Sequence, residues 1–294
     1  MSTDFLCRGI LDDLNIRFSY AVVTDVANDA ILAHDCDPLS GHILSRSLCA
    51  AVLSAPLLND GERYTLRWNY SGACKNVVID VGASADVRGF VNPADLLSRA
   101  DREDQIYGES GTVAAIKSTH EQVLNSGTVE AGLLDPVEDL AFFFSLSDQV
   151  ETGLSALVAL AQDVKRPVRL CQGVMIQALP DCDLAAFDDI RGRLRQPDVR
   201  GLLEEPPLVD NHFELIARAL AGDVDGPLGW SSFQSHRPEF RCACGREQIL
   251  QVVRTLPASD IQDQIAKEEG LRITCTFCAR VHTVALDELQ SLMG

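Results

Sequence analysis

Four cysteines near the end of this 294-residue chain have the types and spacing that could do chemistry. Cys242 and Cys244 lie in FRCACG, and Cys275 and Cys278 follow in ITCTFCAR. Two close thiol pairs separated in this way match a tetrahedral zinc site, because a tight backbone turn can aim each pair at one point. We therefore predict that these four side chains bind Zn²⁺. Thiolates are also oxidisable, so the same atoms could hold a fold together or release it.

Other interpretations of the cysteines stay open. They could be four unrelated buried thiols, or His282 or His236 could replace one sulfur in a Cys₃His site. A thioredoxin-like redox pair at Cys275 and Cys278 is disfavoured, because a helix should follow that motif whereas Val281–Leu286 is predicted to be extended.

The segment that holds the cysteines, residues 238–294, is predicted to be a small zinc-binding redox-switch domain. We expect a β-hairpin from Leu271–Thr274 and Val281–Leu286, with the second cysteine pair at its turn, and short helices at Gln248–Leu256 and Asp260–Glu269. A core this small is marginal alone, and a structural metal is a common remedy.

Local signals also predict the ends of the second of these helices. Ser259 with Gln262 has the spacing of a capping box, and Gly270 lies where a helix usually ends.

Composition limits the classes of protein that fit. The net charge is −18, from 43 acidic and 25 basic residues, which disfavours nucleic acid and an anionic membrane surface as partners. The start, MSTDFLCRGILDD, has acids where a signal peptide needs basic residues, so we expect a cytoplasmic protein. In a reducing compartment, cysteines are better read as metal ligands or buried thiols than as disulfides. The six outside the two pairs are expected to be inert and buried: Cys7, Cys36, Cys49, Cys74, Cys171 and Cys182.

Residues 1–180 are predicted to form a mixed α/β core domain, so the fold class of the whole chain is α+β. Helices are expected at Ser40–Leu58 and Val137–Phe144, the second with Asp135 as N-cap and Pro136 in its first turn. Runs of β-branched and aromatic residues predict strands at Ile16–Val26, Tyr64–Asn69, Val77–Val81, Val87–Val91, Gly111–Lys117, Ala156–Ala161 and Val168–Leu179.

Residues 181–237 are predicted to be a helical linker. Leu184–Leu194 and Leu208–Leu220 each carry apolar residues on one helical stripe, and the second helix should be capped near Asp210. Asp223–Ser235 is predicted to be a loop. The two helices either pack on the core simply to stabilise it or act as a releasable clamp, because helices this short need packing to persist.

The order of these parts resembles the redox-regulated thirty-three-kilodalton heat-shock chaperone family of bacteria, over essentially the full length. The most specific likeness is FRCACGREQILQVVRTLPASDIQDQIAKEEGLRITCTFCAR, which holds both cysteine pairs. The segments VRGFVNP, DLAFFFSLSDQ and GVMIQALP resemble the family's core more loosely. Cys171 and Gln172 stand where small residues are usual, and SDQ replaces the more usual SEQ.

The resemblance implies a mechanism. Reduced Cys242, Cys244, Cys275 and Cys278 would hold zinc while the chaperone is inactive. Oxidation would form the disulfides Cys242–Cys244 and Cys275–Cys278, release the zinc, unfold the tail and loosen the linker helices. The C-x-x-C pair would sense peroxide, the active form would be a homodimer, and unfolded or misfolded proteins would be its clients.

Two rival functions fit the sequence less well. A zinc ribbon that binds nucleic acid should have a basic tail, whereas residues 238–294 hold eight acidic and six Lys or Arg residues. An enzyme would need a nucleophile–base pair or a cofactor loop, and neither GxGxxG nor GKS/T occurs in the sequence. We therefore predict a chaperone that is not an enzyme.

Overall fold

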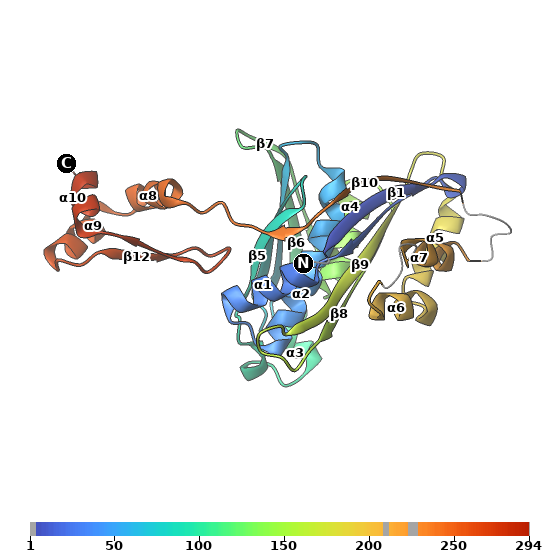
Figure 1. Cartoon of the computed structure of the whole chain (residues 1–294), viewed down its shortest axis with the longest axis horizontal. Coiled ribbons are helices and arrows are strands. Elements are labelled where there is room, and N and C mark those ends of the chain that lie inside the picture. The colour runs from blue at the N-terminus through green and yellow to red at the C-terminus, as the bar shows by residue number, and fades with distance from the viewer. Residues whose placement is uncertain (1–3, 208–211, 223–228, 294) are drawn as a thin grey trace. The chain divides into compact units, whose positions relative to one another are not determined.

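A computed structural model describes residues 4–207, 212–222 and 229–293. The chain forms two compact units that divide between Phe240 and Arg241. Helices and strands occur in both units, which confirms the predicted α+β class (Figure 1). Among the described residues, no helix combines the length and the apolar character needed to cross a bilayer.

A five-stranded antiparallel sheet forms one layer of the first unit. Its order is β10-β1-β2-β9-β8, so β10 and β8 lie at its two edges. The strands are β1 Phe5–Leu11, β2 Ile16–Val22, β8 Thr152–Leu160, β9 Val168–Ala178 and β10 Trp230–His236.

A six-stranded sheet forms a second layer, with the order β11-β5-β4-β3-β6-β7. All its pairs are antiparallel except β11 with β5. The strands are β3 Arg63–Tyr70, β4 Asn76–Gly82, β5 Asp86–Asn92, β6 Gly111–Ser118, β7 Val123–Glu130 and β11 Glu239–Phe240.

The main core lies where helices pack against both sheets. Helix α2 (Pro38–Ser54) contacts strands of each sheet, and α4 (Pro136–Ser147) packs against β6, β7 and β8. Asp135 caps α4 by accepting from the N–H groups of Val137 and Glu138, with Pro136 in the first turn, as the sequence predicted. The remaining short elements of this unit are η1 Asp12–Leu14, α1 Thr24–His34, η2 Ala55–Leu57, η3 Leu96–Ser98 and α3 Glu103–Tyr107.

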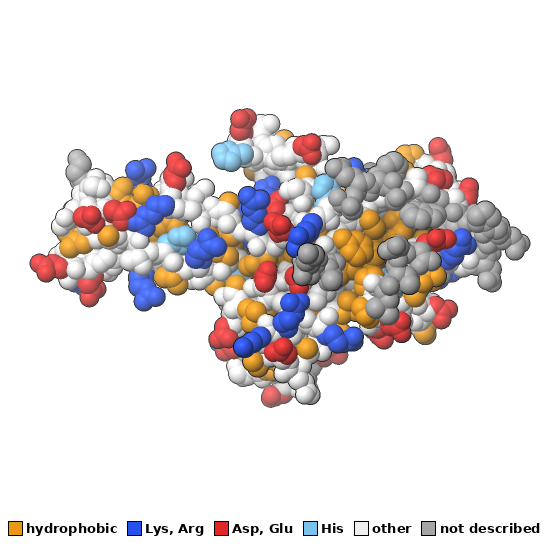
Figure 2. Space-filling model, viewed as in Figure 1, with side chains coloured by type: hydrophobic (Ala, Val, Ile, Leu, Met, Phe, Trp, Pro, Cys, Tyr) orange, Lys and Arg blue, Asp and Glu red, His pale blue; other side chains and the backbone are white. Residues whose placement is uncertain are grey.

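A second core joins three helices to the five-stranded sheet. Helices α5 (Leu184–Arg193), α6 (Pro197–Glu204) and α7 (His212–Ala221) bury their apolar stripes against β1, β2 and β9. The rings of Phe18 and Phe213 stack with centroids 4.0 Å apart. Hydrophobic side chains gather beside α6 and α7 in Figure 2. The linker helices therefore pack on the core. The predicted start of the second helix, Leu208 to Asp210, lies outside the described residues.

Three predictions about the first unit were incomplete or wrong. The strand predicted for Ile16–Val26 ends at Val22, because α1 begins at Thr24 and the Asp4 carboxylate accepts from the N–H groups of Asp25 and Val26 at its N-terminus. The predicted loop Asp223–Ser235 contains most of β10, which pairs with β1 in spite of its polar composition. Helix α6 was not predicted, because prolines and glycine interrupt its sequence.

The second unit is small. Strands β12 (Leu271–Thr274) and β13 (Val281–Val284) form the predicted hairpin, in antiparallel register from Leu271 opposite Val284 to Thr274 opposite Val281. The helices are α8 Arg246–Thr255, α9 Ala258–Ala266 and α10 Leu286–Met293. Among the described residues of this unit, five buried apolar side chains form its core: Ile249, Val253, Ile261, Val284 and Leu289.

The predicted capping of α9 was wrong. Pro257 is the N-cap, and the Ser259 hydroxyl donates to the carboxylate of Asp260 instead of joining a capping box with Gln262. The left-handed residue after the helix is Glu268, with φ 55°, and not Gly270. The division into residues 1–180, 181–237 and 238–294 stays a proposal about function, since α5–α7 belong to the first compact unit.

Candidate metal centre

The four predicted cysteines meet at one point in the second unit. The sulfurs of Cys242, Cys244, Cys275 and Cys278 all lie within 4.8 Å of one another. Two short distances join the two motifs: Cys242 Sγ lies 3.7 Å from Cys275 Sγ, and Cys244 Sγ lies 3.3 Å from Cys278 Sγ. Each motif therefore contributes two sulfurs to a single cluster.

The hairpin positions the second pair of sulfurs. Cys275 follows β12 directly, and its N–H donates to the carbonyl of Arg280 at 2.9 Å. The Ala279 N–H donates back to the Cys275 carbonyl at 2.8 Å, and Ala279 adopts φ 54°. This left-handed residue closes a tight turn that brings Cys278 beside Cys275.

The start of α8 positions the first pair. Gly245 is the N-cap, and the Gln248 side chain accepts from its N–H at 3.0 Å. Arg246 in the first turn donates to the carbonyl of Thr283 and forms an ion pair with Glu288, so it connects α8 to the hairpin and to α10. The hydrogen bond from Arg246 lowers the pKa of Glu288.

The donor set fits zinc. Four sulfurs at Zn–S distances of 2.3 Å around a tetrahedral ion are about 3.8 Å apart, close to the separations observed here. Desolvation, followed by hydrogen bonds with the other three cysteines, raises the pKa of the Cys244 thiol. Desolvation also raises the pKa of Cys278, against hydrogen bonds from the Arg280 backbone and from Cys244 that lower it. A divalent cation would reverse this preference, because it binds thiolates and releases their protons.

The structure places the alternative histidine ligands differently. His282 Nε2 lies 3.4 Å from Cys244 Sγ, so the ring contacts the cluster without belonging to the group of four sulfurs. His236 pairs with Leu6 across the β1–β10 ladder in the first unit. The sequence did not predict that His282 supports Cys244 by this contact. Spacing along the chain does not show which face of the hairpin lies against the cluster.

The other six cysteines do not join this centre. Cys49, Cys74 and Cys171 are buried and the remaining three are partly buried. Burial raises the pKa of Cys7 to about 11, and it raises the pKa of Cys36 and of Cys74 to about 12. These thiols are protonated at neutral pH, as expected for unreactive core residues.

Comparison with known proteins identifies the family. A family model described as Hsp33 protein matches residues 4–285. The chain belongs to the Hsp33 family. An Hsp33 relative from Geobacter sulfurreducens, named 33 kDa chaperonin, is 28% identical over 99% of this chain and 95% of its own length. One from Clostridium botulinum with the same name is 26% identical over 99% of this chain and 97% of its own.

The fold agrees with this assignment. The crystal structure of the 33 kDa chaperonin, an Hsp33 homologue from Thermotoga maritima, superposes with a TM-score of 0.81 at 20% sequence identity. The superposition covers 99% of this chain and 98% of the Thermotoga maritima chain. The Hsp33 architecture is therefore present along the whole chain.

Proposed function

We propose that this Hsp33-family protein is a redox-regulated chaperone that is inactive with zinc bound and active after oxidation. The observation that carries the proposal is the cluster of four sulfurs within 4.8 Å, in a unit whose described residues form a core of five buried apolar side chains. Such a core is marginal, so a metal contributes much of its stability. The relatives' name, 33 kDa chaperonin, supports a chaperone over an enzyme.

Zinc would be held by Cys242, Cys244, Cys275 and Cys278 as four thiolates. The ion would stabilise the unit and keep the sulfurs deprotonated, which is the form that oxidants attack. His282, at 3.4 Å from Cys244, can donate an N–H to that sulfur and fix its orientation.

Oxidation would form the disulfides Cys242–Cys244 and Cys275–Cys278, with the C-x-x-C pair reacting first. Each disulfide forms when two thiols lose two electrons and two protons to one hydrogen peroxide, which becomes two waters. All four sulfurs would be ligands of the same ion, and they lie within 4.8 Å of one another. A disulfide between two of them would remove two ligands from the ion, which couples oxidation to loss of the ion.

Loss of the ion would unfold the second unit and loosen α5, α6 and α7. Their buried stripes, which include Phe187, Ile190, Phe213 and Ile216, would then be exposed to unfolding client proteins. The net charge of −18 would keep the loaded chaperone in solution. A homodimeric active form and a cytoplasmic location are part of the same proposal, and both rest on the family resemblance.

The test measures zinc and chaperone activity on the same sample. We expect one zinc per chain in the reduced protein, with release after peroxide and mild heating. The oxidised protein should suppress light scattering by a thermally unfolding client, and the reduced protein should not. Zinc release without any change in client aggregation would refute the proposal.

A further inference from the structure

The outer edge of β8 has unpaired backbone groups. Strand β9 pairs with β2 on its other side, where the Cys171 carbonyl accepts from the Val23 N–H. The backbone N–H and C=O groups of Cys171 and of every second residue after it therefore point toward β2. Their partners on β8 are Val158, Ala156 and Leu154, whose N–H and C=O groups therefore point away from β9.

Two contacts at this edge confirm the alternation. The Thr152 N–H donates to Ser145 Oγ at 3.0 Å and not to β9. The Ala156 carbonyl accepts from Arg46 Nε at 3.1 Å. In the described part of the chain, the N–H groups of Leu154, Ala156 and Val158 have no hydrogen-bond partner. Leu154 to Val158 spans about 13 Å, long enough to pair with an added strand, but Leu154 and Ala156 are buried in this form, so pairing requires the elements over them to move.

A groove follows this edge. Two cavities, of about 600 and 500 Å³, are lined by β8 from Thr152 to Ala159 and share Arg46, Ala156, Leu157 and Arg200. Helix α4 lines one side of the larger cavity, and α5 and α6 line the other. Phe142 and Leu146 of α4 and nearby Leu133 line it while 42%, 57% and 51% exposed, respectively.

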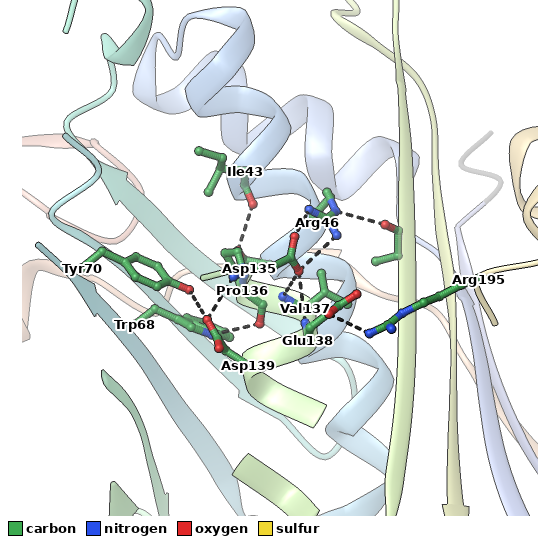
Figure 3. Close-up of polar contacts among 12 residues, drawn as sticks. Ile43, Arg46, Trp68, Tyr70, Asp135, Pro136, Val137, Glu138, Asp139 and Arg195 are labelled. Carbon is green, nitrogen blue, oxygen red and sulfur yellow. Dashed lines mark hydrogen bonds and ion pairs between the residues drawn. The ribbon is translucent and has the colours of Figure 1, made fainter. Parts of the chain in front are cut away.

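Contacts from helix α5 and the residues after it attach the linker to this groove. Arg195, after α5, forms an ion pair with Glu138 of α4 at 2.8 Å (Figure 3). Arg191 of α5 forms another with Glu151 at 2.9 Å. Leu194 lies against Gly153, where a Cβ would come within 2.8 Å of its Cδ1. These contacts attach α5 to one side of the groove, so a movement of α5 would open that side.

We infer that the β8 edge is a client-binding site that pairs with an extended segment of an unfolded protein once α5 and α6 loosen. The occupant is identified by chemistry: the free N–H and C=O groups need a backbone in β conformation, and Leu133, Phe142 and Leu146 offer contacts to alternate apolar side chains. Arg46 and Ser145 blunt the edge in the closed state, since each occupies one edge group. The inference rests on the proposed chaperone function.

Hydrogen exchange of single amides tests the site. The probe client is reduced and carboxymethylated lactalbumin, which stays unfolded, added to the full chain after oxidation by peroxide. We expect exchange at Leu154, Ala156 and Val158 to slow at least about tenfold, and exchange at Gly153 and Ser155, already paired with β9, to change little. Unchanged exchange at the three edge amides would overturn the inference.

A pair of variants separates backbone pairing from side-chain packing. Val158→Pro removes an edge N–H without removing a ladder hydrogen bond, whereas Val158→Ala keeps the N–H and loses bulk. We expect client affinity to fall at least about fivefold in V158P and to stay near the parent value in V158A, since one lost backbone bond costs this much. Equal losses in the two variants, or none, would contradict strand addition.

Two further observations make the result unambiguous. Light scattering on the same samples reports the proposed chaperone function. Suppressed client aggregation with unchanged exchange at the edge amides would therefore contradict this inference and leave the proposed function intact. Edge protection that appears without client and rises with protein concentration would assign the edge to a second copy of the chain, and would also overturn it.

Discussion

Tyr20 Oη donates a hydrogen bond to Gln172 Oε1 at 2.5 Å, and both side chains are fully buried between the five-stranded sheet and α6. The Gln172 amide nitrogen in turn donates to the carbonyls of Leu203 and Glu205, both at 2.7 Å. These are C-terminal carbonyls of α6 that have no partner within the helix. Gln172 therefore fastens the linker helices to the sheet through a polar contact in an apolar core.

Replacing Gln172 with leucine should weaken this attachment. The variant leaves Tyr20 and two helix carbonyls without partners, which should lower the free energy of unfolding by about 1–3 kcal/mol. Proteolysis and hydrogen exchange should show α5–α7 opening more often in the reduced, zinc-bound protein. The exposed Gln122→Leu is the matched control. Equal protection of α5–α7 in Q172L and the parent would rule out this role.

Folding of the second unit should require the metal, whereas folding of the first unit should not. Cys278→Ser should abolish stoichiometric zinc binding and unfold residues 241–294, because the five-residue core cannot supply the roughly 10 kcal/mol or more that such a site provides. Circular dichroism and metal analysis measure the two effects. Cys182→Ser, outside the cluster, should bind zinc normally. A folded second unit in metal-free C278S would contradict the structural role.

The sequence predicted those elements of the fold that depend on interactions between residues close together in the chain. The hairpin around Cys275 and Cys278 and the cap of α4 at Asp135 were correctly predicted, because both depend on neighbouring residues. The start of α1 was not, because it is capped by Asp4, twenty-one residues earlier in the sequence. Strand β10 is polar, and only its pairing with β1 makes it a strand.

The same limit applies to the functional sites. The four ligand candidates were recognisable because C-x-C and C-x-x-C are local patterns. The supporting roles of Arg246 and His282 come from contacts across the second unit, with partners at Glu288 and Cys244. The free edge of β8 follows from strand order, which single-strand patterns do not contain.

Stability should depend on pH through Asp4. Burial raises the pKa of this carboxyl from 3.8 to about 6, in spite of hydrogen bonds from the N–H groups of Asp25 and Val26 that lower it. Since the folded-state pKa is raised, the contribution of Asp4 to stability is present below about pH 4 and is lost as the pH rises through 6.

Asp4→Asn removes this titration, so the parent should lose up to about 2–3 kcal/mol relative to D4N between pH 4 and pH 7. Urea unfolding at a series of pH values measures the difference. Exposed Asp60→Asn is the control and should run parallel to the parent. Parallel curves for D4N and the parent would show that Asp4 titrates alike in the folded and unfolded states.

Arg246 should slow the local opening of the second unit. Its guanidinium joins the start of α8, directly after the first cysteine pair, to the Thr283 carbonyl and the Glu288 carboxylate. Because the group is partly exposed, Arg246→Gln should cost only about 0.5–1 kcal/mol, enough to speed local opening severalfold. Zinc release under peroxide, followed with a chromogenic chelator, should accelerate by that factor while the reduced protein still binds one ion. Arg254→Gln, on the exposed face of the same helix, should release zinc at the parent rate. If R246Q also matches the parent, attack on the thiolates and not opening of the unit limits the rate.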